Sequence, residues 1–169
     1  IRFQSMSGLL QVHRQGDLLV LDFPSRPPAS CATPAGLLGA LGLSPRPVAK
    51  ARDHFVVVDS EAELAALKPD FSALDKVDCF GAIVTAPGDR VDFVSRFFTP
   101  AAGIPEDPVT GSAHCTLIPY WAQRLGKRVL SARQISQRGG DLACELKGDR
   151  VAIGGRAVKV LEGHFLLPD

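Results

Sequence analysis

The alternation of apolar and polar residues predicts a chain built mostly from short strands. Residues 1–23 predict a strand pair that turns at RQGD (14–17). Further strands are expected at 54–60, 79–87 and 89–100. Because the turns between successive strands are short, the pattern favours antiparallel pairing.

The end of the chain continues this pattern. The segments 128–140, 141–155 and 156–168 are separated by the short turns GG, KGD and GG. They predict a meander of about four strands.

Three helices interrupt the strands. Residues 35–43 predict a short helix, and 60–70 predict a second one, in which Ser60 is the N-cap and Glu63 stands at the capping-box position. A longer helix is expected at about 111–126, with Gly126 just beyond its end. Its predicted apolar face consists of Ala113, Leu117, Tyr120, Trp121 and Leu125.

The order of these elements predicts an α+β fold. Strands outnumber helices, and an antiparallel, barrel-like sheet is expected to wrap around the 111–126 helix. Four prolines within residues 24–34 favour extended backbone and mark a connector between two units. Ile1 stands directly in strand-like sequence, so we expect it to lie inside a longer protein.

Composition and charge exclude several classes of function. Of the 169 residues, 46% are hydrophobic, and the net charge is +1 with no basic stripe, so nucleic-acid binding is not expected. No apolar run reaches 18 residues, so no membrane span is expected. The four cysteines and four histidines are scattered without ligand spacing, which predicts no metal site and reduced thiols in a cytoplasmic protein.

The segment GIPEDPVTGSAHC (103–115) has two competing interpretations. In the first, it is an ordinary helix start with Asp107 as N-cap and Pro108 at the first helical position. In the second, the free N–H groups of the helix start bind a carboxylate, and Asp107 beside them is a general acid or base. Glu106 would then act on Asp107 by like-charge repulsion or simply face solvent. The residues alone leave both interpretations open.

Other residues of this segment have assigned parts in the second interpretation. Gly111 lacks a Cβ atom, so a ligand can approach the backbone closely, and the hydroxyls of Thr110 and Ser112 add donors. His114 and Cys115 are expected to be packing residues of the apolar helix.

The stretch RFFTPAAGIPEDPVTGSAHCTLIPYWAQRLGK (96–127) resembles the signature region of the PhzF-like isomerases of phenazine biosynthesis. The similarity continues through SARQISQRGGDLACELKGDRVAIGGRAVKVLEG (131–163) and back to FQSMSGLLQV (3–12). The resemblance implies a fold shared with diaminopimelate epimerase and proline racemase, in which two similar domains each wrap a sheet around a helix. It also implies cofactor-independent proton transfer at carbon in a small carboxylic acid. Asp107 would be an acid/base residue, and Thr110, Gly111 and Ser112 would bind the substrate.

The resemblance covers the C-terminal part of the family. We therefore expect residues 1–28 to be closing strands of a first domain, 29–36 a Pro-rich linker, and 37–169 the second domain. The catalytic Glu and the GHAT-like helix start of the family's first half are not found in this sequence. The 169 residues alone are expected to be inactive, and to meet the N-terminal half of the protein or a second subunit, as in a homodimer. The alternative is a non-catalytic module that binds carboxylates or another protein.

Overall fold

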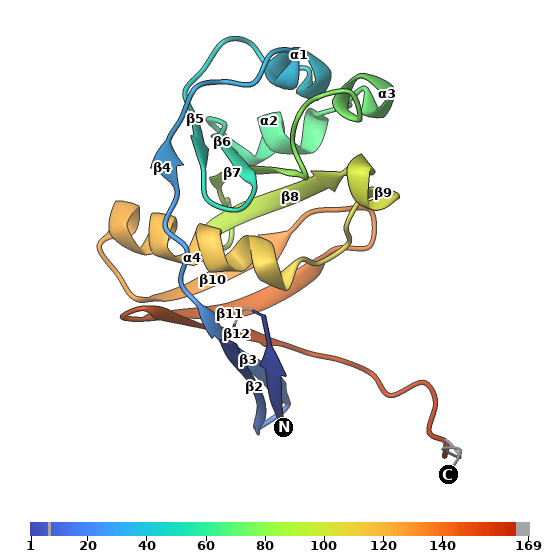
Figure 1. Cartoon of the computed structure of the whole chain (residues 1–169). Helices are drawn as coiled ribbons and strands as arrows, with labels where there is room; N and C mark the ends of the chain where they lie inside the picture. Colours follow the sequence, from blue (N-terminus) through green and yellow to red (C-terminus); the bar gives the residue numbers. More distant parts are fainter. Residues whose placement is uncertain (7, 165–169) are drawn as a thin grey trace.

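One curved sheet runs through the whole structure (Figure 1). The computed structural model describes residues 1–6 and 8–164, and within them twelve strands form a sheet in the order β1-β2-β3-β12-β11-β10-β8-β7-β6-β5-β4, with β9 paired to β8. The strands are β1 (Arg2–Ser5), β2 (Gly8–Gln15), β3 (Leu18–Pro24), β4 (Ala29–Ser30), β5 (Val48–Lys50), β6 (His54–Val57), β7 (Ala82–Pro87), β8 (Phe93–Thr99), β9 (Ile104–Glu106), β10 (Val129–Gln134), β11 (Gly140–Lys147) and β12 (Arg150–Gly155). The helices are α1 (Leu37–Leu41), α2 (Glu61–Ala66), α3 (Phe71–Leu74) and α4 (Gly111–Leu125), with a 3-10 turn η1 at Pro100–Ala102. The fold is therefore α+β and dominated by the sheet, as the sequence predicts.

The sheet is mixed, so the expectation of antiparallel pairing is wrong in two places. β6 pairs with β7 in parallel, and β8 pairs with β10 in parallel. Parallel neighbours need a long crossover, and here α2 with α3 connects the first pair while α4 connects the second. The longer connections between these strands, rather than the short turns, account for the difference.

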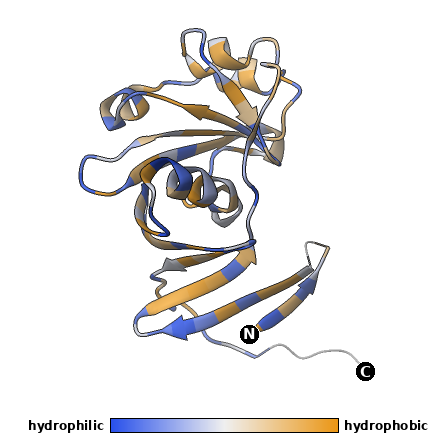
Figure 2. Cartoon of the chain, turned by 90° about the vertical axis from the view of Figure 1, so that its left-hand side faces the viewer, coloured by the Kyte–Doolittle hydropathy of each residue, from blue (hydrophilic) through white to orange (hydrophobic). Residues whose placement is uncertain are grey.

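The sheet curls around α4, which Figure 2 shows nearly end-on between its strands. Leu117, Ile118 and Trp121 of α4 are fully buried in this core. The Trp121 ring stacks on Phe93 at a centroid distance of 5.7 Å, and its indole N–H donates to Thr85 Oγ1 at 3.0 Å. Leu125 of the predicted apolar face is instead 42% exposed, because it is the last residue of α4.

The opposite face of the sheet carries a second core. The short helices α1, α2 and α3 cover it, and Leu37, Leu64 and Leu74 contribute fully buried side chains. The predicted cap of α2 is confirmed, because the Glu63 N–H donates to Ser60 Oγ at 3.1 Å. The structure thus has α4 on one side of the sheet and three short helices on the other (Figure 1).

A proline interrupts the hydrogen bonding of α4. Pro119 lies inside the helix and has no N–H for the carbonyl of Cys115, four residues earlier. The backbone N–H of Arg26 donates to this carbonyl at 2.8 Å. The Pro-rich connector after β3 is thereby attached to the middle of α4.

The two ends of the chain differ from the core. β3 pairs with β12 over Leu19–Pro24, so β1–β3 extend the same sheet beyond α4 (Figure 2). The strand predicted at 156–168 is not formed over 156–164, and 165–168 lie outside the described residues. Within the described residues, no helix is both long and apolar enough to cross a membrane.

Candidate active site

Asp107 lies between the end of β9 and the start of α4. Its backbone N–H donates to the carbonyl of Phe97 on β8 at 3.0 Å, and its carboxylate Oδ2 accepts from Thr110 Oγ1 at 2.6 Å. The helix begins at Gly111 with Thr110 as N-cap. The helix-cap interpretation, with Asp107 as N-cap and Pro108 as the first helical residue, is therefore wrong.

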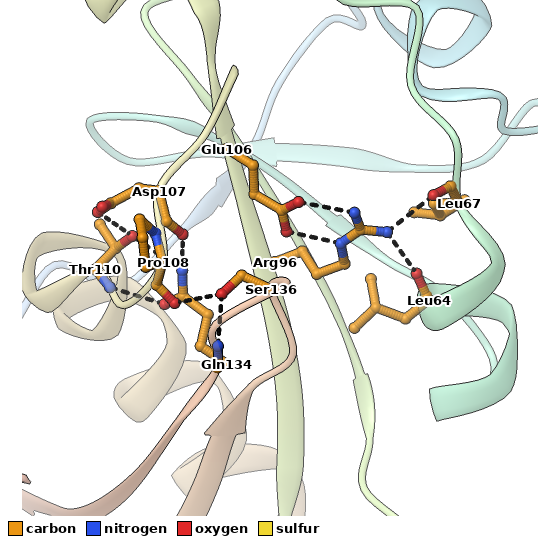
Figure 3. A network of polar contacts seen from close by, with 10 residues as sticks. Leu64, Leu67, Arg96, Glu106, Asp107, Pro108, Thr110, Gln134 and Ser136 are labelled. Carbon is orange, nitrogen blue, oxygen red and sulfur yellow. Dashed lines mark hydrogen bonds and ion pairs between the residues drawn. The ribbon is translucent and has the colours of Figure 1, made fainter. Parts of the chain in front are cut away.

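The Asp107–Thr110 loop is held from below by Gln134, at the end of β10 (Figure 3). The Gln134 amide nitrogen donates to the Asp107 carbonyl at 2.7 Å and to Thr110 Oγ1 at 3.1 Å, while its oxygen accepts from the Thr110 N–H at 2.8 Å. Gln134 is completely buried. Its three bonds fix the backbone at both ends of the loop.

The β10–β11 hairpin supplies two further contacts to the loop. Ser136 Oγ donates to the Pro108 carbonyl at 2.7 Å. The Val109 side chain lies against Gly140, where an added Cβ atom would come within 2.6 Å of Val109 Cγ2. A side chain at position 140 would therefore force Val109 to shift.

Sequence reasoning missed the residues of the hairpin. One signal for Gln134 was present, because Leu130, Ala132 and Gln134 alternate along β10 and all three are buried. A glutamine at an inward-facing position must find partners for its amide. These partners could not be predicted from the sequence, because they lie 24 and 27 residues away and depend on the tertiary structure.

Glu106 has neither of the roles expected of it. Its carboxylate forms a two-pronged ion pair with Arg96 of β8, with both N–O distances at 2.8 Å, and both side chains are largely buried. Arg96 also donates to the carbonyls of Leu64 and Leu67 at the end of α2. This network, on the right in Figure 3, connects β9 to β8 and to the end of α2. Glu106 therefore has a structural role.

The N-terminus of α4 has no side-chain cap. The Thr110 hydroxyl, which stands in the capping position, donates to Asp107 instead. The first N–H groups of a helix have no partner within the helix, and the positive end of its dipole favours anions. Uncapped donors and a carboxylate thus stand next to each other at this point.

Gly111 and Ser112 form the first turn, and both are partly exposed. Gly111 does not have a positive φ, and a Cβ atom there would meet only Phe23 at 3.7 Å, an ordinary contact distance. Neither backbone conformation nor packing therefore requires glycine at position 111.

His114 and Cys115 lie on the buried side of α4. Burial raises the pKa of the Cys115 thiol to about 11, which makes it a poor nucleophile. Burial also lowers the pKa of His114 to about 4, so this side chain is neutral near pH 7. Within the described residues, no group of three or more His, Cys, Asp or Glu side chains could hold a metal ion.

Comparison with known proteins places the chain among phenazine biosynthesis-like proteins. The family model described as "phenazine biosynthesis-like protein" matches residues 24–163. A Pseudomonas aeruginosa protein named as an uncharacterized isomerase is 53% identical over 167 residues, covering 99% of this chain and 64% of that protein. A phenazine biosynthesis-like domain-containing protein of Rattus norvegicus is 36% identical and covers 96% of this chain. The crystal structure of a PhzF-family protein from Enterococcus faecalis superimposes with a TM-score of 0.89 at 46% identity, covering 99% of this chain and 65% of that one.

The fold of this chain is thus shared with a solved PhzF-family protein. The chain belongs to the phenazine biosynthesis-like (PhzF) family. It spans 64% of the length of these curated relatives.

Proposed function

We propose that this chain supplies one wall of the active site of an isomerase that moves a proton at carbon in a small carboxylic acid. The observation that carries the proposal is the position of the Asp107 carboxylate. It is bonded to the Thr110 hydroxyl and lies four residues before the first residue of an uncapped helix. In the proposed reaction, the substrate carboxylate binds the N–H groups of Gly111 and Ser112. Asp107 then takes a proton from a carbon next to the carboxylate or to a C=C bond conjugated with it, and the electron pair of the broken C–H bond moves into that π system.

The proton is returned at another carbon, or by a group on the facing wall. No redox change occurs, and a side-chain acid/base suffices for each transfer, so we propose that the reaction is cofactor-independent. Thr110 is a supporting residue here, because its buried hydroxyl is already bonded to Asp107.

We further propose that the facing wall comes from another segment of the protein or from a second subunit. Asp107, Gly111 and Ser112 are only partly buried, so the described residues leave the site open to water. Proton transfer at carbon needs preorganised donors in a site from which water is excluded. The 169 residues alone are therefore expected to be inactive. We also propose that the longer protein has two domains with the site between them, as in diaminopimelate epimerase.

The test is exchange of solvent deuterium into candidate acids. The longer protein, in which the facing wall is present, is incubated in D₂O with small carboxylic acids that carry a hydrogen next to the carboxylate, and incorporation is followed by mass spectrometry. We expect Asp107→Asn to abolish the exchange, while Asp141→Asn, at a surface position 78% exposed, leaves it unchanged. Exchange by Asp107→Asn at the wild-type rate would refute the proposed role. Exchange by the 169 residues as fast as by the longer P. aeruginosa relative would refute the requirement for a second wall.

The second candidate is a non-catalytic module that binds carboxylates or another protein. The observation that favours it is the apolar face of β1–β3, where Phe3 and Leu19 are 52% and 42% exposed. Phe3 pairs with Leu10, and Val12 pairs with Leu21, so these side chains share one face. We propose that the missing half of the protein or a second copy, as in a homodimer in the cytoplasm, covers this face. Light scattering that shows a monomer, with no fragment co-purifying, would contradict this.

A further inference from the structure

The buried His114 side chain is bonded to the backbone at the start of its own helix. Its Nδ1 atom lies 2.7 Å from the carbonyl oxygen of Thr110, and the residue is fully buried. A carbonyl oxygen can only accept a hydrogen bond, so Nδ1 must carry the proton. The neutral ring then has its lone pair on Nε2, which has no partner among the described residues.

This side-chain bond replaces much of the first backbone bond of α4. The backbone N–H of His114 also points to the Thr110 carbonyl, but at 3.4 Å, whereas the ring nitrogen approaches to 2.7 Å. The carbonyl of the helix start is therefore held mainly by the imidazole.

The orientation of one peptide group follows from this contact. The Thr110–Gly111 peptide bond is trans, so its C=O and N–H point in opposite directions. The ring of His114 holds the C=O toward the buried side of α4. The N–H of Gly111, a partly exposed residue, then points the other way, out of the N-terminal end of α4.

We propose that His114 is a positioning residue, which holds the Thr110 carbonyl through Nδ1–H and so aims the Gly111 N–H at the bound carboxylate. The proposal rests on the proposed function only in taking a carboxylate as the ligand. His114 also helps to hold the carboxylate of Asp107 in place through Thr110, because Thr110 Oγ1 donates to Asp107 Oδ2.

The other ring nitrogen, Nε2, has no partner among the described residues, and a buried acceptor without a donor is unfavourable. The bond from Nδ1 to Thr110 is the contact that offsets the burial of this ring. Burial keeps the pKa of His114 at about 4, so near pH 7 the ring is neutral and its single N–H is the one on Nδ1. His114 therefore works as a fixed donor and not as a proton carrier.

The chain offers a matched pair of variants. In His114→Asn the amide nitrogen stands close to the position of Nδ1 and can donate to Thr110, and in His114→Leu no donor remains. The experiment is ¹⁵N NMR of the protein, with acetate as the carboxylate probe and chloride at equal ionic strength as the control.

In the wild type we expect the Nδ1–H tautomer, unchanged from about pH 5 to about pH 8, and shifts of the Gly111 and Ser112 amides on addition of acetate. His114→Leu should weaken acetate binding about tenfold, the loss of roughly one hydrogen bond, and His114→Asn should restore it. An Nε2–H tautomer, or wild-type acetate binding by His114→Leu, would overturn the proposal.

Failure of the proposed function gives a different result. If the wild-type amides respond to acetate no more than to chloride, the carboxylate site is wrong. The positioning role is then decided by the Gly111 amide signal without ligand. This signal should move in His114→Leu and return in His114→Asn, and a signal that stays in place in both variants would refute the role.

Discussion

The hydrogen bond between the connector and α4 can be tested by removing a single backbone N–H. Arg26→Pro deletes the donor that satisfies the Cys115 carbonyl, in a segment already rich in proline. Arg26→Ala is the matched control, because it removes the same side chain and keeps the N–H. The difference between the two variants therefore measures the backbone bond.

The magnitude follows from the structure. Cys115 is only 2% exposed, so its carbonyl loses a partner that water does not readily replace. An unsatisfied buried group costs about 1–3 kcal/mol, and the added proline returns about 0.4–1 kcal/mol by restricting the unfolded chain. We expect Arg26→Pro to be less stable than Arg26→Ala by about 1–2 kcal/mol.

Pro119→Ala completes a double-mutant cycle with the two Arg26 variants. It restores an N–H four residues after Cys115, so the helix can satisfy the carbonyl itself. In that background the difference between Arg26→Pro and Arg26→Ala should fall to nearly zero. Urea unfolding followed by the fluorescence of Trp121, the single tryptophan of the sequence, gives each free energy of unfolding. A penalty for Arg26→Pro that is the same with and without Pro119 would refute the reasoning.

Three further predictions concern the site. Gln134→Leu leaves the Thr110 N–H and the Asp107 carbonyl without their partner and should lower the free energy of unfolding in urea by about 2–4 kcal/mol. The control Gln137→Leu, at an exposed position, should leave it nearly unchanged. Equal stabilities of the two variants would contradict the role of Gln134. Gly111→Ala should leave the free energy of unfolding unchanged or raise it by up to about 1 kcal/mol, because the added Cβ atom meets no close contact. It should nevertheless weaken acetate binding in an NMR titration. Unchanged binding would show that the carboxylate does not approach the helix at Gly111. Burial lowers the pKa of His114 to about 4 from 6.5, so between these pH values the unfolded chain binds a proton that the folded chain does not. As the pH drops through this window, the free energy of unfolding should therefore fall by about 2–3 kcal/mol more in the wild type than in His114→Asn. Parallel pH profiles of the two proteins in urea unfolding would contradict the burial argument.

Local patterns in the sequence predict much of the fold. α4 occupies Gly111–Leu125 against the expected 111–126, and Gly126 adopts a left-handed φ of 66° just beyond it. The Ser60 cap also follows from local rules, because its partner lies three residues away. The parallel pairs β6–β7 and β8–β10 could not be predicted in this way, because register between distant strands depends on how the intervening helices pack.

The candidate site shows the same division. The residues that the motif singled out, Asp107, Thr110, Gly111 and Ser112, are contiguous, so the structure necessarily brings them together. The partners of Glu106 and Thr110 could not be predicted, since Arg96 and Gln134 reach them through strand pairing. His114 was expected to be a packed or hydrogen-bonded residue of the helix. Its partner could not be predicted, because a contact between a side chain and the backbone four residues earlier leaves no pattern that separates it from burial.

The central claim is that Asp107 moves a proton and does not merely help to bind the ligand. The most direct test uses the longer protein, with the facing wall present, and measures in the same samples the Kd of an acid that it labels with deuterium and the rate of that labelling. General acid–base catalysis contributes about 10²–10⁴ in rate, so Asp107→Asn should lower the labelling rate by at least about a hundredfold while the Kd stays close to that of the wild type. A labelling rate that falls only in proportion to a weakened Kd would contradict the account, because Asp107 would then be a binding residue.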